Sequence, residues 1–399
     1  MRQFFSISLA FGLSVTPLAV SQLALAQSES PISHEGRYWV RTFTGSISGP
    51  AMERFRLDTV GSVVLRGDSQ DRVVYKLKAR VRARDARDAD DLLRQFDVKS
   101  RTQGQWSYLT VAPSRRISEG PELSLTVPRG LRQVLVETRG GDVQASNLDG
   151  EMEARSAGGQ INVDGIKGRC ELRTGGGDIQ VGTVGGSVRC YSGGGVIRVQ
   201  SAGGESWFET AGGEIFVHQA AGPLHAATAG GNIRIDRALG TVFARTAAGL
   251  IQVQQADGAV TAESYGGAIQ VNAANGVKCD SAGGPIRLRN VGGPLRASTA
   301  AGSILAELLS GNRIEDSTLS TNAGDITVFI ASNLPLTVAA RNESAGALGR
   351  IISDFPEIRV KALSQAGANP VVAEGALNGG GPILRINVVG GTIYLRRQK

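Results

Sequence analysis

The sequence predicts an all-β protein built around a parallel β-solenoid of about ten 18-residue rungs. Blocks of 18 residues begin at positions 140, 158, 176, 194, 212, 230, 248 and 266, and less regular blocks begin at 283, 301 and 323. Within a block, position 4 is Val or Ile, position 6 is usually Val, and positions 2 and 11 are usually Gly. Such a sustained period is typical of stacked copies of one supersecondary unit.

Alternation inside each block predicts two short strands per rung. Positions 4, 6, 13 and 15 are apolar or small, so they share one strand face and point inward. Stacked rungs would lie about 4.8 Å apart and form a flat rod on the order of 50 Å long. The glycines are expected in the turns, where they adopt positive φ at little cost. Position 17 predicts a row of inward hydroxyls at one corner: Thr174, Ser192, Thr210, Thr228, Thr246, Ser264 and Thr299.

Other solenoids with similar periods fit the residues less well. A calcium-binding nonapeptide roll needs Gly and Asp at positions 4 and 6, where this chain has Ile and Val, so repeated calcium sites are not expected. A left-handed hexapeptide helix needs an aliphatic residue at position 16, where this chain has Arg155, Arg173, Tyr191 and Glu209. The large pectin-degrading β-helices use longer rungs.

Residues 1–26 have the features of a secretory signal. Arg2 precedes an apolar run, and Ala24-Leu25-Ala26 is a small-residue cleavage site that would leave Gln27 as the new N-terminus. No later stretch is long and apolar enough to predict a transmembrane segment. We therefore expect an exported protein in the periplasm, on the outer surface or outside the cell.

Residues 27–139 lack the repeat and predict a small antiparallel β domain. Val73 to Val81 alternate apolar and charged residues as one strand, and Asp85 to Phe96 predict a short helix. Further strands are expected at Trp106–Val111 and Leu123–Val127. The role of this domain would be to cap the solenoid, because an uncapped end exposes unpaired backbone.

The solenoid itself is predicted over residues 140–322, and residues 323–399 are predicted to form the final rungs and a C-terminal β cap. The tenth rung has extra residues around Asn312–Leu319, which are expected in a loop. The ending returns to the repeat pattern at Ile383–Ile386 and Ile393–Leu395, so the cap should finish in a strand.

The composition supports neither a nucleic-acid partner nor a metal or cofactor. The chain has 43 basic and 36 acidic residues, and removing Arg2 leaves 42 − 36 = +6, an excess that is spread along the sequence. Cys170, Cys190 and Cys279 have no metal-binding spacing and are expected as small, unpaired core residues. Asp142 and Asp178 at rung starts are expected to be turn formers.

Several features together resemble the bacterial "putative adhesin" β-solenoid family. They are a strand-rich head, the turn Pro128-Arg-Gly130 leading into Gly-Gly-Asp-Val, Gly-Gly-x-Ile-x-Val rungs, and a tail with Gly-Gly-Thr-Ile393-Tyr-Leu395. The resemblance covers about residues 45–399. It implies an envelope or surface-binding protein, and it supplies no catalytic motif.

One outward row carries the candidate site. Position 14 is Arg189, Trp207, His225 and Phe243 on four consecutive rungs, and Tyr191 and Glu209 at position 16 flank them. Equivalent positions align on a solenoid, so these six residues should form one stripe, and a large exposed apolar patch usually marks a binding surface. The stripe could instead be covered by another part of the chain. On the opposite sheet, polar residues at position 5 predict a structural ladder: Gln144, Asn162, Gln180, Arg198, Arg234, Gln252, Gln270 and Arg287, interrupted by Phe216.

Taken together, the residues predict an exported, non-enzymatic solenoid that presents a binding surface at the cell envelope, with a polysaccharide or a surface protein as ligand. No catalytic residue is assigned. The alternative is a structural scaffold that self-assembles into homo-oligomers. A hydrolase of envelope polymers is a third hypothesis, and it would need a catalytic carboxylate that the sequence does not identify.

Overall fold

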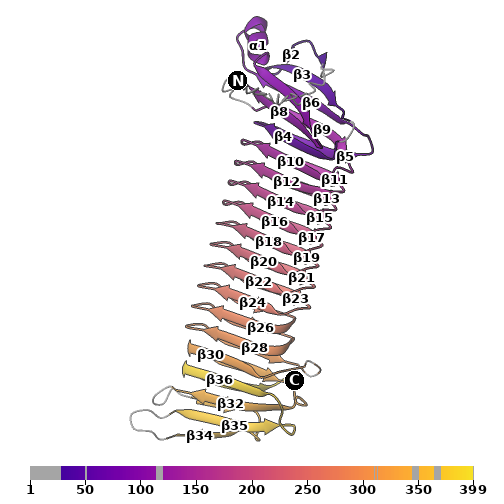
Figure 1. Ribbon diagram of the computed structural model, residues 1–399. Helices are drawn as coiled ribbons and strands as arrows, with labels where there is room; N and C mark the ends of the chain where they lie inside the picture. The colour runs from indigo at the N-terminus through magenta and orange to yellow at the C-terminus, as the bar shows by residue number, and fades with distance from the viewer. Residues whose placement is uncertain are drawn as a thin grey trace, which may run out of the picture.

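The computed structural model describes residues 28–49, 52–113, 120–309, 311, 313–343, 350–363 and 370–398. The predicted signal, residues 1–26, lies outside this range. The described residues form a long rod made of two stacks of strands, a 19-stranded sheet A and an 18-stranded sheet B, with α1 (Ala86–Leu93) at one end (Figure 1). The predicted all-β solenoid is therefore confirmed.

Each regular rung contributes one strand to each sheet, and neighbouring rungs pair in parallel. In sheet A, Ile161 pairs with Ile179 and Ile179 with Ile197, a register of one whole repeat. The sheet A strands of the rungs are β11 (Val143–Leu148), β13 (Ile161–Ile166), β15 (Ile179–Val184), β17 (Ile197–Ala202), β19 (Ile215–Ala220), β21 (Ile233–Ala238), β23 (Ile251–Ala256), β25 (Ile269–Val271), β27 (Ile286–Leu288), β29 (Ile304–Leu308) and β31 (Ile326–Ile330). Those of sheet B are β12 (Glu151–Ser156), β14 (Cys170–Thr174), β16 (Val188–Ser192), β18 (Ser206–Thr210), β20 (Leu224–Thr228), β22 (Val242–Thr246), β24 (Val260–Ser264), β26 (Ala274–Ser281), β28 (Val291–Thr299) and β30 (Ser317–Ala323).

The core is the inward row of each strand, as the alternation predicted. Ile179, Ile197 and Ile233 of position 4 are fully buried, and so are Val188 and Leu224 of position 13 on the facing sheet. A single rung exposes these apolar residues above and below, so they leave water only when rungs stack. The same apolar cluster runs from the head to the last rung.

The position 2 glycines are needed for a different reason from the one predicted. At Gly195, Gly213 and Gly231 the structure gives no positive φ. A Cβ on Gly213 would instead lie 2.1 Å from the carbonyl oxygen of Gly195 on the preceding rung. Glycine is therefore required there because the backbones of successive rungs approach too closely for a side chain.

The predicted hydroxyl row links the rungs at this corner. The Thr228 Oγ1 donates to the carbonyl oxygen of Gly213 at 2.9 Å and accepts from the amide of Gly231 at 3.2 Å. Thr174 and Thr246 make the same two bonds on their own rungs. Because the side chains are buried, each hydroxyl satisfies two backbone groups that water cannot reach.

The aspartates at rung starts also bond between rungs rather than within their own turn. The Asp142 carboxylate accepts from the backbone amide of Gln160 at 2.8 Å, and Asp178 accepts from that of Val196 at 2.8 Å. Each acceptor and donor are one repeat apart. These carboxylates therefore serve the stacking of the rod.

The three cysteines are buried and unpaired, as expected. Burial without a cationic neighbour raises the pKa of the Cys170 thiol from 9.0 to about 12, and it also raises the thiol pKa of Cys190 and Cys279. The thiols therefore stay protonated and act as small core side chains.

The head is mixed rather than purely antiparallel. Its strands are β1 (Ser28–Glu29), β2 (Ser33–Glu35), β3 (Tyr38–Ile47), β4 (Arg54–Thr59), β5 (Ser62–Asp68), β6 (Val73–Val81), β7 (Phe96–Gln103), β8 (Trp106–Pro113), β9 (Glu122–Pro128) and β10 (Gln133–Thr138). The pairs β3–β6, β6–β9 and β7–β8 are antiparallel, but β4 pairs in parallel with β8 and β10, and β5 with β9 and β11.

Both stacks therefore begin inside the head and pass without a break through the boundary predicted at residue 139. The division there into separate folding units stays a prediction. The helix is confirmed in a shorter form: α1 covers Ala86–Leu93, and the Asp85 side chain caps it by accepting from the amides of Arg87 and Asp88.

The C-terminal end finishes in a strand, as expected, but that strand is inserted into the stack. Its strands are β32 (Leu336–Asn342), β33 (Arg350–Ser353), β34 (Arg359–Ala362), β35 (Val371–Leu377), β36 (Ile383–Gly390) and β37 (Thr392–Arg397). Strand β36 pairs in parallel with β30 and β32, and β37 with β31 and β33. The last rung of the chain thus lies between two earlier ones.

Candidate binding surface on sheet B

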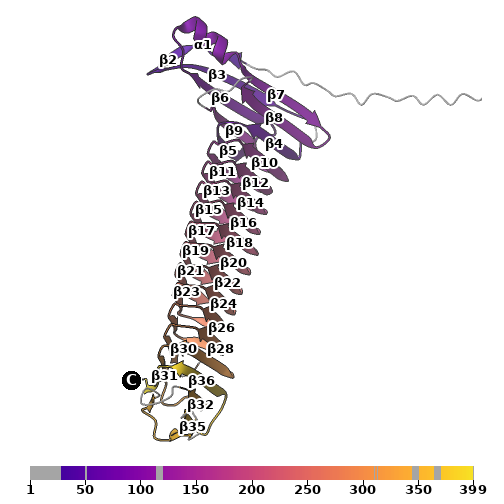
Figure 2. The same ribbon diagram turned by 90° about the vertical axis from the view of Figure 1, so that its left-hand side faces the viewer.

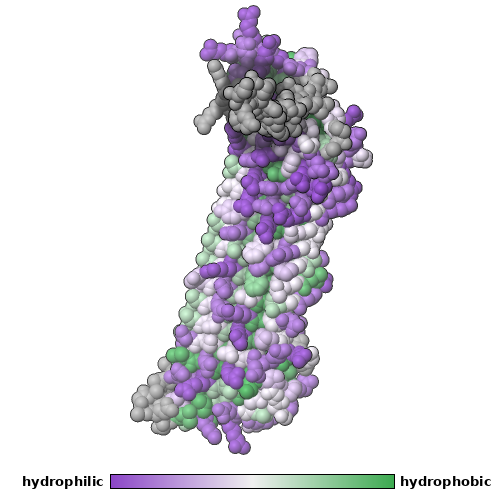
Figure 3. Space-filling model, in the orientation of Figure 1, coloured by the Kyte–Doolittle hydropathy of each residue, from purple (hydrophilic) through white to green (hydrophobic). Residues whose placement is uncertain are grey.

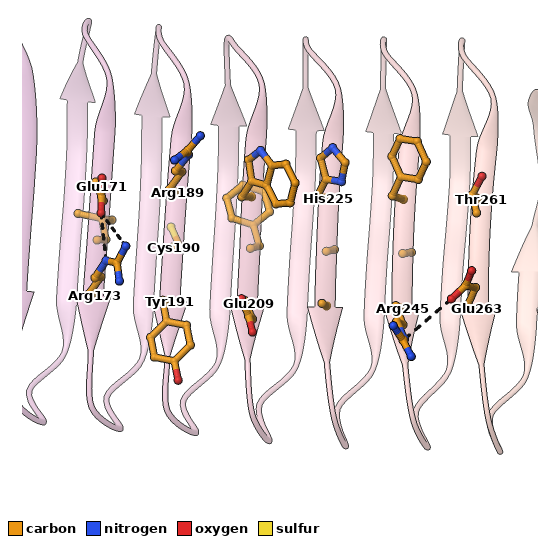
Figure 4. A pocket seen from close by; sticks show the side chains of 17 residues that line it. Glu171, Arg173, Arg189, Cys190, Tyr191, Glu209, His225, Arg245, Thr261 and Glu263 are labelled. Atoms are coloured by element: carbon orange, nitrogen blue, oxygen red, sulfur yellow. Dashed lines mark hydrogen bonds and ion pairs between the residues drawn. The ribbon is translucent and has the colours of Figure 1, made fainter.

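The structure brings all six predicted site residues together on the outer face of sheet B (Figure 4). Arg189 and Tyr191 are on β16, Trp207 and Glu209 on β18, His225 on β20 and Phe243 on β22. They line a shallow groove of about 690 Å³. The in-register pairs Arg189–Trp207, Trp207–His225 and His225–Phe243 align the row along the rod axis. We call these six residues the stripe.

Three aromatic rings of the stripe form one stack. The ring centroids of Trp207 and His225 are 3.8 Å apart and those of His225 and Phe243 are 4.8 Å apart, with 6° between the ring planes in both pairs. The rung spacing enforces this arrangement, because in-register side chains of parallel strands lie about 4.8 Å apart. Both faces of the His225 ring are therefore turned to a neighbour. On the Trp207 ring, the indole N–H donates to the Glu205 carboxylate at 3.3 Å.

The apolar residues of the stripe are open to solvent. Tyr191 is 45% exposed, and Trp207 and Phe243 are each 44% exposed. No described residue covers them, so the alternative that another part of the chain buries the stripe does not hold for the part of the chain that the structure describes. Figure 3 shows other apolar residues exposed along the rod, with polar residues gathered around the head.

The charged side chains on the neighbouring rungs of sheet B have partners, whereas those of the stripe have none among the described residues. On the rungs before it, Arg155 contacts Glu153 at 2.5 Å and Arg173 contacts Glu171 at 3.0 Å, each pair within one rung. Among the described residues, Arg189 and Glu209 form no ion pair or side-chain hydrogen bond, because an aromatic residue takes the place of the opposite charge on each rung. Polar groups without a protein partner are available to a ligand.

A small hollow lies in the middle of the groove, beside the His225 ring. Position 16 carries Tyr191, Glu209, Ala227, Arg245 and Glu263 on successive rungs, so Ala227 leaves a gap between the carboxylate of Glu209 and the guanidinium of Arg245. Arg245 reaches Glu263 at only 3.9 Å.

Ala227, Arg245 and Glu263 were not among the predicted site residues. Their place follows from position 16 of the repeat, just as the row of Arg189, Trp207, His225 and Phe243 follows from position 14.

The stripe offers contacts for binding rather than a recognisable reaction centre. Among the residues that the structure describes, no group of three or more His, Cys, Asp or Glu could hold a metal ion. A search of the same residues finds no helix with the length and apolarity of a membrane span. The available groups are aromatic faces and edges, one guanidinium and one carboxylate without partners, and a gap about the size of one side chain.

Several side chains on the opposite face of the same rungs pair between rungs. His218 Nδ1 lies 3.1 Å from the Asp236 carboxylate, and the Asn232 amide donates to Glu214 at 2.9 Å. These bonds come from positions 3 and 7 of the repeat. The predicted ladder at position 5 is wrong in this respect, because among the described residues its amides make no hydrogen bonds with one another. Arg234 instead lies over the Phe216 ring, 5.7 Å from the centroid.

Comparisons with known proteins leave the ligand open. No family model and no curated protein matches the chain. A solved structure titled "putative cell adhesion protein" from Clostridium sporogenes ATCC 15579 is 8% identical, with TM-score 0.20, over 90% of this chain and 100% of that chain. A "putative adhesin" from Bacteroides fragilis NCTC 9343 is 14% identical, with TM-score 0.22, over 72% of this chain and 97% of that chain. Both likenesses are too low to transfer a function.

Proposed function

We propose that this protein is an exported, non-enzymatic binding protein of the cell envelope, and that the stripe is its ligand-binding surface. The observation that carries the proposal is the stack of solvent-exposed rings beside two charges, Arg189 and Glu209, that have no partner among the described residues. Aromatic side chains combine a large apolar area with low conformational entropy, which is why they are enriched at binding sites. The ligand is an envelope polysaccharide or a surface protein.

Self-assembly into a scaffold is the second candidate, and the two ends of the rod argue against its end-to-end form. At the head, β6 pairs antiparallel with β9 and β7 with β8, and at the other end β35 pairs antiparallel with both β32 and β34. Such ends present irregular edges in place of a rung template. Side-by-side association through sheet B would bury the stripe and is distinguishable by concentration-dependent assembly.

A hydrolase of envelope polymers is the third candidate and receives the least support. It needs an acid and a base, or an acid and a nucleophile, held at a defined separation on either side of the bond. It would require turnover of a glycan that stops when Glu209 or Glu263 is changed to the amide.

The test is co-sedimentation of the purified protein with isolated cell wall and with surface polysaccharide. The Trp207→Ala/Phe243→Ala variant is compared with Phe216→Ala, which removes an outward ring from the opposite face of the same rungs. The proposal predicts that the first variant loses binding and the second binds normally. Equal binding by both variants would exclude the stripe as the site. If the parent protein stays monomeric and binds neither the cell wall nor the polysaccharide, these ligands are excluded.

A further inference from the structure

We infer that the ligand is a neutral, linear polysaccharide that runs along the outer face of sheet B and also contacts a second aromatic cluster in the head. The inference rests on the proposed function, because it takes the stripe as one of two contact points. The second cluster consists of Arg54, Arg101, Trp106 and Tyr108. We call these four residues the head cluster.

The head cluster is a preformed arrangement of rings and guanidinium groups. The Trp106 and Tyr108 rings have centroids 5.9 Å apart with 28° between their planes. Arg54 lies over the Trp106 ring at 5.5 Å from its centroid, and Arg101 over the Tyr108 ring at 4.4 Å. Cation–π contacts of this kind hold the side chains in place before a ligand arrives. Trp106 and Tyr108 are half-buried and point outward from β8.

The head cluster and the stripe lie on one row of the same sheet. Strand pairing places Tyr108, Arg56, Leu135, Glu153, Glu171, Arg189 and Trp207 in register, one on each successive strand. In Figure 2 these strands, β8, β4, β10, β12, β14, β16 and β18, follow one another along one side of the rod. Six strand steps separate Tyr108 from Trp207, which corresponds to about 29 Å.

The surface between the two clusters is polar but internally neutralised. The Arg56 guanidinium donates to Asp58 and to Glu137, both at 3.1 Å, and the hydrogen bond to Asp58 raises the pKa of Arg56. The pairs Arg155–Glu153 and Arg173–Glu171 follow on the next rungs. Paired opposite charges attract a polyanion weakly, yet they offer hydrogen-bond donors and acceptors to hydroxyl groups. On this intervening surface a neutral, hydroxyl-rich chain is therefore favoured over an acidic polymer.

Two contact points this far apart select for length. A short oligosaccharide reaches one cluster, whereas a chain longer than about 29 Å reaches both. The second contact is then intramolecular, and binding gains from its effective concentration without any new kind of interaction. A peptide ligand would not need this spacing, since it could add to an edge strand or fill one groove.

The experiment uses neutral envelope polysaccharide cut into size-graded fractions, with an acidic envelope polysaccharide as the second arm. Binding is measured by titration calorimetry with the parent protein, with Trp106→Ala/Tyr108→Ala, and with the stripe variant Trp207→Ala/Phe243→Ala. We expect neutral fractions longer than about 29 Å to bind at least tenfold more tightly than shorter ones. The head variant should bind long fractions only as tightly as short ones, and its retained binding of short fractions shows that it is folded.

Each of the other outcomes contradicts the two-point inference, the neutral ligand or the proposed function. If length has no effect, or if the head variant binds like the parent, the two-point inference is wrong while the proposed function stands. Tighter binding of the acidic polymer, with a steep loss of affinity in salt, would overturn the assignment of a neutral ligand. If neither polysaccharide binds the parent protein, the inference fails together with the glycan form of the proposed function.

Discussion

The two outer faces of the same rungs differ in how their side chains are partnered. On sheet A, His218 bonds Asp236 and Asn232 bonds Glu214, each one repeat along the chain. On sheet B, among the described residues, Arg189 and Glu209 have no partner, and the rings of the stripe contact mainly one another. Both faces share one backbone register and one core, so this difference is not a requirement of the fold.

The inward and the outward side chains of the rod contribute differently to its stability. Stability comes from inward rows, rung-to-rung hydroxyls and close backbone stacking, which are the same for both sheets. Outward side chains contribute less, because exposed ion pairs are each worth about 0–1 kcal/mol. The exposed rings and the charges without partners on sheet B are therefore not required for folding.

The largest expected effect comes from breaking the scaffold that both faces share. Gly213→Ala should destabilise the protein by roughly 3 kcal/mol, because the new Cβ would lie 2.1 Å from the Gly195 carbonyl oxygen. Its neighbour Gly212→Ala is the matched control, since a Cβ there meets its first atom at 4.0 Å. Urea unfolding of both variants measures the difference. Equal stability of the two would mean that the rungs are not stacked as closely as described.

Truncating one ring on each face sharpens the contrast between them. Trp207→Ala should weaken ligand binding about tenfold, because it removes an exposed aromatic contact from the stripe. Phe216→Ala on sheet A should leave binding unchanged. Neither variant should lose more than about 1 kcal/mol of stability, since both rings lie on the outside of the rod. A similar loss of binding in both variants would contradict a division of roles between the faces.

Alkaline pH tests the core that lies between the two faces. Burial raises the pKa of the Cys170 thiol from 9.0 to about 12. Below pH 9 the thiol is protonated in both the folded and the unfolded chain, so it adds no pH dependence to the stability. Above pH 9 the unfolded chain releases the proton and the folded chain does not, so stability falls by up to about 1.4 kcal/mol per pH unit per thiol.

Cys170→Ala should therefore show a shallower loss of stability than the parent between about pH 8 and about pH 11. Urea unfolding across this range measures both slopes. Identical slopes would indicate that the thiol is not buried in the folded protein.

Changing a single charge is expected to have the smallest effect and to act on one face only. Glu209→Gln should reduce ligand affinity by about threefold with unchanged stability, because this carboxylate has no partner within the described protein. The control is Asp236→Asn on sheet A, which breaks the contact with His218 and should not alter binding. Titration of both variants with the same polysaccharide fraction gives the comparison. A larger effect of Asp236→Asn on binding would indicate that the ligand binds sheet A.

The sequence predicted the regular rungs and the stripe because both follow from the period alone. Once Ile179 and Ile197 are known to be equivalent, Arg189, Trp207, His225 and Phe243 must align on the same row. The exposure of the stripe and the absence of partners for Arg189 and Glu209 could not be derived in this way. Both features depend on the side-chain conformations of neighbouring rungs, and the exposure also requires that the head leaves the stripe uncovered.

The two ends were harder to predict because the order of strands in space differs from their order in the chain. In the first rung, the corner that joins β4 to β5 is Thr59-Val-Gly61-Ser-Val63. This corner is one residue shorter than the corner from Ser192 to Ile197, and it lacks the Gly-Gly pair. Its parallel pairing with β10 and β11 was therefore missed. At the other end, the pattern of Ile393 and Leu395 identifies a rung but does not indicate that it inserts beside β31.

Ligand-dependent footprinting of both faces in one experiment tests whether the ligand binds sheet B. Hydroxyl-radical labelling of the protein, with and without bound envelope polysaccharide, reports on Tyr191, Trp207 and Phe243 of sheet B and on Phe216 and His218 of sheet A. The account predicts that the ligand protects the three sheet B residues and leaves the two sheet A residues unchanged. Protection of Phe216 and His218 with no protection of the stripe would contradict it.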